Sequence, residues 1–196
     1  EVAKAWEDAA RAASLPQTRL VLTRTAMMMS PDTGGVFDVL LRLVRWRQGG
    51  RHGDGRQVVS WINEADYVRA VQWLIEYELE GEVNVASPCP IPNADFMREL
   101  REAWGTTGRG SPPVGLPAAR WMLELGTFLL RSETELVLKS RRVVPGRLRE
   151  SGFEFELPQW REAAVELCGR WRERRTRSNG RKDETRAAGE AAELAR

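Results

Sequence analysis

The chain offers few side chains whose types and spacing suit catalysis or metal binding. Its one histidine, His52, has no serine, cysteine or acid at the spacing of a catalytic motif, so a surface loop position is favoured over a general base. The two cysteines, Cys89 and Cys168, are too few for a disulfide framework or a four-ligand metal site. The sequence therefore predicts no catalytic residue and no metal site, and Cys168 is expected in the core of a helix.

A glycine-rich stretch from Gly49 to Gly55 could be taken for a phosphate-binding loop. The dinucleotide fingerprint G-x-G-x-x-G lies after a strand and before a helix, whose N-terminus meets the pyrophosphate. Here the stretch follows a predicted helix and precedes a predicted strand, so ordinary turn chemistry is favoured. The run Met27, Met28 and Met29, after a predicted strand, is expected to fill gaps near a pocket.

Two segments at the carboxyl ends of predicted strands are more promising. Arg24 and Thr25 end the first strand, and the run from Ser60 to Asn63 ends the second. In open parallel sheets, ligands bind outside the carboxyl ends of the strands, and these ends share one edge of the sheet. We therefore expect the two segments to line one cleft. For Trp61, an apolar wall of that cleft and a place in the core both stay open.

The elements that position these segments follow from hydrophobic spacing and from breaker residues. Strands are expected where short apolar runs lie between turn signals, and helices where apolar residues recur every three or four positions. Asn63 and Asn93 stand where helix N-caps are expected. The predicted strands are 18–25, 57–62, 83–86 and 153–155, and 26–35 is a predicted loop. The predicted helices are 3–13, 36–47, 64–78, 93–104, 116–130, 145–151 and 159–174, and 135–144 could be helix or strand.

This order of elements predicts an α/β fold. Strands alternate with helices through Ala86, which is typical of a Rossmann-like parallel sheet, and residues 93–174 are expected to form an α-rich lobe. Residues 175–196 have no large apolar side chain except Leu194, so they are predicted to form a basic mobile tail. Nine Lys and Arg face five acids from Arg170 onward, but no aromatic residue follows Trp171, so a solvated tail is favoured over nucleic-acid binding.

Composition narrows the classes of protein that remain. With 42% hydrophobic and 30% charged residues, the chain can form a packed core, and wholesale disorder is not expected. The net charge of +2 is too balanced to argue for nucleic acid. No apolar run approaches the roughly 18 residues of a membrane-spanning helix, and no signal-like segment follows Glu1. We therefore expect no membrane partner and a cytoplasmic location.

Four segments in order carry a resemblance to a known family. They are RLVLTRTAMMMSPDTGG, GDGRQVVSWINEADYVRAVQWLIE, EGEVNVASPCPIPNADFMRELREAWG and LKSRRVVPGRLRESGFEFELPQWREA. Together they resemble the epimerase-like oxidoreductases of the extended short-chain dehydrogenase/reductase superfamily. More narrowly, they are similar to the YfcH-type branch, whose members end in domain of unknown function 1731. The resemblance covers residues 1–174 and implies that 1–92 belong to the Rossmann-like domain.

The resemblance also draws attention to motifs that this sequence lacks. Full-length members begin with a G-x-x-G-x-x-G turn that binds the dinucleotide pyrophosphate, and the superfamily uses a Tyr-x-x-x-Lys pair as acid/base and ribose anchor. Here Tyr67 and Tyr77 are followed at that offset by Ala70 and Glu80. The segment around Lys4 is similar to the later part of the helix that carries the family's lysine, so Lys4 is not assigned as a catalyst.

For the cofactor, the resemblance implies NAD or NADP in full-length members and no cofactor for this chain alone. Thr25, Ala26 and Met27 are similar to the segment that passes the nicotinamide end of the cofactor. Asp66 is similar to a helix-start acid with a structural role.

For the substrate, Ser60, Trp61 and Asn63 resemble the segment beside the substrate cleft. Nucleotide-sugar epimerases often have an arginine shortly before that segment, where this chain has Val59. This departure speaks against a nucleotide-sugar substrate, although Arg56 could partly substitute for the arginine. Arg142 is expected to approach from the helical lobe and to offer a cation to an anionic group of a small-molecule substrate, with a plain surface arginine as the alternative.

Two hypotheses of function follow. In the first, the chain is the C-terminal fragment of an NAD(P)-dependent epimerase-like oxidoreductase and is inactive alone. This is favoured because the sequence opens at Glu1, without Met, partway into a family segment. In the second, it is a stand-alone, non-catalytic interaction module whose basic tail contacts a partner.

Overall fold

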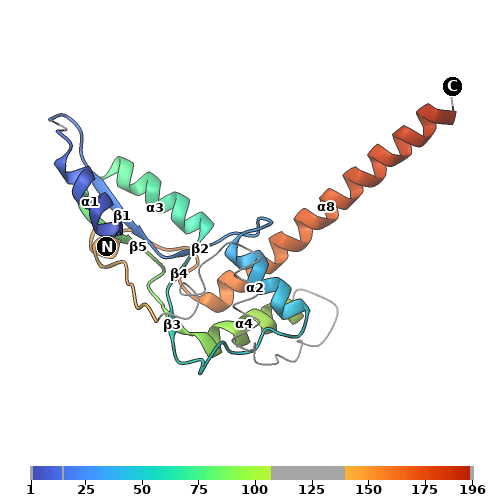
Figure 1. The fold of residues 1–196 in the computed structure, drawn as a ribbon, viewed down its shortest axis with the longest axis horizontal. Coiled ribbons are helices and arrows are strands. Elements are labelled where there is room, and N and C mark those ends of the chain that lie inside the picture. Colours follow the sequence, from blue (N-terminus) through green and yellow to red (C-terminus); the bar gives the residue numbers. More distant parts are fainter. Residues whose placement is uncertain (1, 15, 107–139, 195–196) are drawn as a thin grey trace.

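The computed structural model describes residues 2–14, 16–106 and 140–194 (Figure 1). At one end of the molecule, β1 (Val21–Thr25) pairs in parallel with β5 (Gly81–Val85). Helix α1 (Val2–Ala12) covers one face of this pair, where Arg11 of the helix forms an ion pair with Glu82 of β5. Helix α3 (Glu64–Glu76) covers the other face, where Leu74 packs with Val83. The predicted α/β fold with parallel strands is confirmed.

Two further strand pairs connect this end to the rest of the molecule. β2 (Met27–Met29) pairs in parallel with β4 (Trp61–Asn63), and β3 (Val58–Val59) pairs antiparallel with β6 (Ile91–Pro92). The expectation of a loop from residue 26 to 35 was therefore wrong at its start. The three methionines form a strand because β4, more than thirty residues later in the chain, supplies their hydrogen-bonding partners.

The other end of the molecule is helical. α2 (Val36–Arg45) and α4 (Asn93–Thr106) pack with the first turns of α8 (Trp160–Leu194), and Figure 1 shows the rest of α8 running away from the body. Buried Cys168 lies in this core, as predicted. The side chains that form the largest hydrophobic cluster include Phe37, Leu41, Trp61, Phe96, Leu100, Trp160 and Leu167.

The last helix is longer than the sequence indicates. The predicted end near Arg174 was wrong, because α8 continues to Leu194. Residues 175–194 contain no proline and many arginines, glutamates and alanines, which favour helix over coil. The mobility of this segment stays a prediction.

The predicted start of α3 is confirmed, whereas the predicted strand 153–155 is wrong. Asn63 caps α3 through its Oδ1, which accepts from the N–H of Ala65 at 2.8 Å. Buried Asp66 accepts from the N–H groups of Glu156 and Leu157 at 2.9 and 3.0 Å, which is the structural role expected of it. The predicted strand 153–155 is irregular backbone, because the Asp66 carboxylate binds the peptides that follow it and no strand in the described ranges pairs with it.

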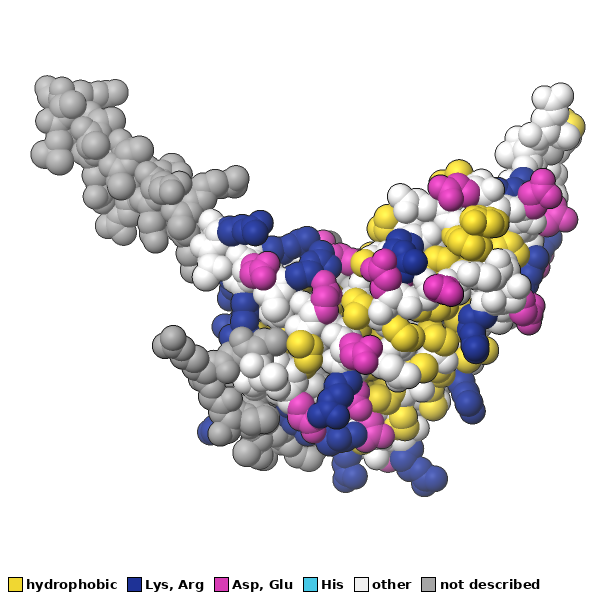
Figure 2. All heavy atoms as spheres, turned by 180° about the vertical axis from the view of Figure 1, so that it is seen from behind, with side chains coloured by type: hydrophobic (Ala, Val, Ile, Leu, Met, Phe, Trp, Pro, Cys, Tyr) yellow, Lys and Arg dark blue, Asp and Glu magenta, His cyan; other side chains and the backbone are white. Residues whose placement is uncertain are grey.

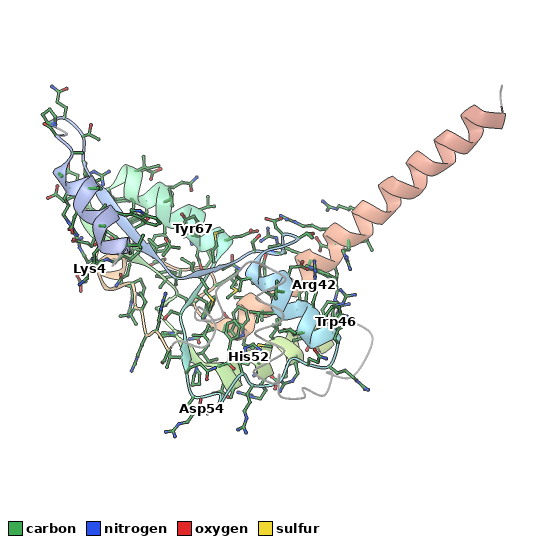
Figure 3. All side chains as sticks on the ribbon, in the orientation of Figure 1. Lys4, Arg42, Trp46, His52, Asp54 and Tyr67 are labelled. Carbon is green, nitrogen blue, oxygen red and sulfur yellow. The ribbon has the colours of Figure 1, made fainter. Side chains whose placement is uncertain are left out.

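His52 is the clearest departure from the sequence prediction. It belongs to the loop 48–57, yet it is fully buried and its ring faces Asn93 at the start of α4, not solvent (Figure 3). Its backbone N–H donates to Oδ1 of Asn93 at 2.7 Å, and its C=O accepts from the side chain of Gln57 at 2.8 Å. These bonds draw the loop inward, which hydrophobic spacing could not indicate.

The remaining predictions divide into confirmed and untested ones. The short helix near 145–151 is confirmed as α7 (Gly146–Glu150). The predicted helix 116–130 and most of the segment 135–144 lie outside the described residues. Among the described helices, none has the length and apolar character needed to cross a membrane. The described residues also contain no group of three or more His, Cys, Asp or Glu that could hold a metal ion.

Candidate functional site

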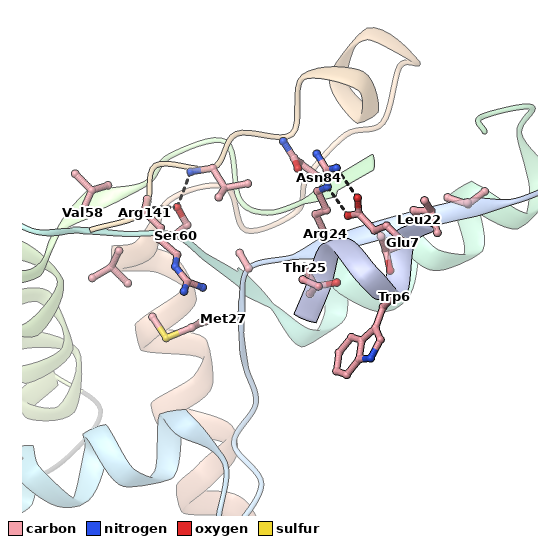
Figure 4. A pocket seen from close by; sticks show the side chains of 16 residues that line it. Trp6, Glu7, Leu22, Arg24, Thr25, Met27, Val58, Ser60, Asn84 and Arg141 are labelled. Carbon is pink, nitrogen blue, oxygen red and sulfur yellow. Dashed lines mark hydrogen bonds and ion pairs between the residues drawn. The ribbon is translucent and has the colours of Figure 1, made fainter. Parts of the chain in front are cut away.

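A cleft of about 730 Å³ lies beside the β1–β5 pair (Figure 4). It is bounded by α1 on one side and by the extended segment 140–143 on another. Its floor is β1 and the residues that follow, down to the start of β2. The residues that line it are Ala3, Trp6, Glu7, Val21–Met27, Val58–Ser60, Asn84, Arg141 and Val143.

Four sequence-predicted residues meet at the carboxyl end of β1. Thr25, Ala26 and Met27 line the cleft there, together with Ser60. The register of the β2–β4 pair explains the meeting, because Met27 lies opposite Trp61, and the N–H of Met27 donates to the C=O of Ser60 at 3.3 Å. The expected closeness of Thr25, Met27 and Ser60 is therefore present. The predicted strand 57–62 is divided into β3 and β4, however, and Ser60 lies between them and not at the carboxyl end of a single strand.

Ser60 holds the segment that brings a cation to this end of the cleft. Its hydroxyl donates to the C=O of Arg141 at 2.6 Å and accepts from the N–H of Val143 at 2.8 Å. A second tie joins Val58 to the same segment, since Val58 accepts from the N–H of Arg141 at 3.1 Å and donates to the hydroxyl of Ser140 at 3.1 Å. The Ser60 hydroxyl is thus used to position neighbouring backbone.

The arginine at the cleft is Arg141. Its side chain points into the cleft above Met27 in Figure 4, and it has no hydrogen bond or ion pair with any described residue. Arg142, the residue named from the sequence, is exposed and does not line the cleft. Successive side chains of an extended segment point to opposite sides, so only one of the two neighbours can enter.

Trp61 and Asn63 also lie away from the cleft. Both are fully buried, and Trp61 belongs to the helical core, where its ring meets Trp160 edge-to-face at 5.0 Å. Asn63 has its amide oxygen on Ala65 and donates its Nδ2–H to Glu166 at 3.2 Å. Of the two interpretations of Trp61, the core position is the one observed. A role of either residue in substrate binding stays a prediction.

An ion pair that the sequence did not indicate lines the opposite wall. Arg24 of β1 donates two hydrogen bonds of 2.8 Å to the carboxylate of Glu7 on α1 (Figure 4). These bonds lower the pKa of Glu7 to about 2. The charge of Arg24 is therefore neutralised by Glu7. This leaves Arg141 as the cation at the cleft wall that no described acid neutralises.

Comparisons with known proteins agree with this fold. The model of the domain of unknown function DUF1731 matches residues 118–167. The epimerase family protein Mb2239 of Mycobacterium bovis is 36% identical over 151 residues, which are 76% of this chain and 47% of that protein. An epimerase family protein of Staphylococcus epidermidis, SERP0438, is 29% identical over 85% of this chain and 53% of its own length. The chain is thus similar in sequence to these epimerase family proteins over most of its own length.

Two solved structures have a similar fold to this chain. The human epimerase family protein SDR39U1, whose crystal structure contains NADPH, matches 84% of this chain and 53% of its own with a TM-score of 0.66 and 24% identity. A nucleoside-diphosphate sugar epimerase of Corynebacterium glutamicum matches 85% of this chain and 30% of its own, with a TM-score of 0.62 and 26% identity. The chain spans about half the length of the curated epimerase family proteins it matches.

Proposed function

We propose that this chain is the C-terminal portion of an NAD(P)-dependent, YfcH-type epimerase-like oxidoreductase. Residues 1–92 supply the last part of its Rossmann-like domain, and residues 93–174 supply a substrate lobe. The observation that carries this proposal is the meeting of Thr25, Met27, Ser60 and Arg141 at the carboxyl end of a parallel strand. This is the place where α/β sheets bind their ligands, and relatives in the epimerase family support the assignment.

The described residues suit only one end of a dinucleotide. Thr25, Ala26 and Met27 present backbone and small or flexible side chains, against which a flat nicotinamide ring could lie. Bound NAD(P) would supply the hydride chemistry. The sequence has no G-x-x-G-x-x-G turn to hold the pyrophosphate, so that contact belongs to the part of the fold that the relatives have and this chain does not span.

The substrate would be a small molecule with an anionic group. Arg141 offers a guanidinium that no described acid neutralises, and such a group binds carboxylate or phosphate in a bidentate manner. Ser60 acts as a positioning residue, because its hydroxyl holds the backbone of Arg141. No described residue is assigned as the catalytic acid or base.

The experiment uses this chain joined to the part of Mb2239 that it does not match, and it compares two neighbouring arginines. We expect NADPH-dependent turnover of carbonyl substrates that carry a carboxylate or phosphate. Arg141→Ala should lower kcat/KM about 10- to 100-fold, as expected for the loss of a charge-assisted hydrogen bond. Arg142→Ala is the matched control, and its effect should stay below about twofold.

Two results would contradict the proposed function. One is a joined protein that folds cooperatively but binds no NADPH, as measured by the fluorescence of the cofactor. The other is a loss of kcat/KM that is larger for Arg142→Ala than for Arg141→Ala, which would return the anion site to the residue that the sequence had indicated.

A further inference from the structure

Arginine side chains gather where the ends of α2 and α4 meet the middle of α8. Figure 2 shows Lys and Arg side chains close to the point where α8 leaves the body. Three of these arginines come from two different helices, since one ends α2 and two belong to α8, and they lie over the rings of two tryptophans. The arginines are Arg45, Arg172 and Arg175, and the tryptophans are Trp104 and Trp171.

The two tryptophans hold the guanidinium groups in place. The rings of Trp104 and Trp171 meet edge-to-face with their centres 5.6 Å apart. The guanidinium carbons of Arg45 and Arg175 lie 4.9 and 4.7 Å from the centre of the Trp171 ring. The guanidinium carbon of Arg172 lies 3.4 Å from the centre of the Trp104 ring. A planar guanidinium over an aromatic ring keeps the N–H groups at its edge available to an acceptor.

Two of these cations have no counterion among the described residues. Arg45 and Arg175 are exposed, and neither forms a hydrogen bond or an ion pair with a residue that the structure describes. The acid against Trp171 is Asp38, whose carboxylate accepts from the ring N–H at 3.1 Å and from Arg42 at 2.7 Å. Because Asp38 is buried and bound in this way, the two exposed guanidinium groups keep their donors and their charge.

Other arginines of α8 show the contrast. Arg170 forms ion pairs with Glu64 and Glu166, and Arg174 forms one with Asp32. These pairs join α8 to the start of α3 and to the loop after β2, so they serve the fold. Ion pairing within the described chain therefore accounts for these two arginines and does not account for the pair over Trp171.

The cations over the tryptophans are also close enough to affect one another. Burial lowers the pKa of Arg172, and the nearby charge of Arg45 lowers it further. Like charges that are held close together are unfavourable unless an anion lies near them. The fold thus holds these groups in an arrangement that a bound anion would stabilise.

We propose that Arg45, Arg172 and Arg175 form a binding site for a ligand with two linked phosphate groups. The site lies between α2 and α8 and is separate from the cleft beside the β1–β5 pair. Each guanidinium can bind phosphate oxygens in a bidentate manner. Because the two exposed guanidinium groups lie beside the same indole ring, a ligand with two linked phosphates is long enough to contact both.

The test uses the full 196-residue chain and inorganic pyrophosphate in isothermal titration calorimetry. We expect a dissociation constant below about 1 mM at low ionic strength, and it should rise with added salt because exposed charges are screened. Sulfate, which has a single anionic centre, should bind at least tenfold more weakly. ADP identifies the source of the phosphates: equal affinity for ADP and pyrophosphate indicates the phosphates alone, and at least tenfold tighter binding of ADP indicates a nucleotide.

Matched variants separate this site from the general charge of α8. Arg175→Gln and Arg177→Gln each remove one exposed positive charge, but residue 177 lies about 200° farther around the helix. We expect Arg175→Gln to weaken the binding of pyrophosphate at least tenfold, because charge-assisted hydrogen bonds are lost. Arg177→Gln should change it less than twofold. Arg45→Lys keeps the charge and loses the planar fork, and it should weaken binding about fivefold with an unchanged midpoint of urea unfolding.

Three results would overturn the proposal. One is the absence of any heat of binding for pyrophosphate over the concentration range in which the site should fill. Another is an equal effect of Arg175→Gln and Arg177→Gln, whether both weaken binding or neither does, because pyrophosphate would then follow the overall charge of α8. The last is sulfate binding as tight as that of pyrophosphate, which would show that the arginines do not recognise linked phosphates.

Discussion

Replacing Trp160 with alanine is expected to lower the free energy of unfolding by about 4 kcal/mol, since buried Trp-to-Ala changes cost about 3–5 kcal/mol. Trp160 is 2% exposed at the start of α8. Its ring stacks on Phe96 of α4 at 3.9 Å and meets Trp61 of β4 edge-to-face at 5.0 Å. Its Nε1–H also donates to the C=O of Phe96 at 2.8 Å. Three elements therefore lose a common packing partner, and the cavity that remains cannot close easily.

The measurement is urea unfolding, followed by far-ultraviolet circular dichroism. Trp160→Phe keeps a stacked ring and loses only the N–H donor, so we expect a loss of about 1 kcal/mol. Trp46→Ala changes an exposed tryptophan and should stay within about 0.5 kcal/mol of the unchanged chain. A loss below about 1 kcal/mol for Trp160→Ala would mean that α8 is held to the body by contacts other than this aromatic cluster.

The parts of the fold that could be predicted from the sequence are those set by neighbours along the chain. Asn63 followed by two acids indicates a helix start, and the structure has the cap at that residue. The short apolar runs before Thr25 and around Val83 predict parallel strands, and the two runs pair with each other. The meeting of Thr25, Met27 and Ser60 was expected, but it has a different cause: Met27 begins β2 and Ser60 directly precedes β4, and these two strands pair in parallel.

The parts that could not be predicted depend on partners far away in the sequence. Choosing Arg141 over Arg142 needs the one-residue register of an extended segment, and the hydroxyl of Ser60, 81 residues earlier, sets that register. The strand of three methionines needs β4 as its partner. Conversely, the segment around Phe153 has strand-forming residues but no strand beside it among the described residues.

His52 shows the same limit and gives the second prediction. A histidine among glycines suggests exposure, yet Asn93 and Gln57 bind its backbone and hold the ring inside. Its Nε2 is buried without a hydrogen-bond partner, and no described carboxylate lies within ion-pair distance. Burial disfavours the charged ring and lowers the pKa of His52 from 6.5 to about 4.

The stability of the protein should therefore fall in mild acid. Between pH 6.5 and pH 4 the unfolded chain binds a proton at His52 and the folded chain does not, so the free energy of unfolding decreases as the pH falls. A difference of about 2.5 pKa units corresponds to about 3 kcal/mol, fully present above pH 6.5 and lost by about pH 4. Urea unfolding at intervals between pH 7 and pH 4 measures this loss.

The matched variant is His52→Phe, which keeps a ring of similar size and cannot titrate. Other groups also contribute to the pH dependence, so the informative quantity is the difference between the two proteins at each pH. We expect this difference to change by about 3 kcal/mol between pH 7 and pH 4, in favour of the variant at low pH. Parallel curves for the two proteins would show that His52 gains its proton as readily in the folded chain as in the unfolded one. In that case the loop 48–57 would have to open to water in the native state.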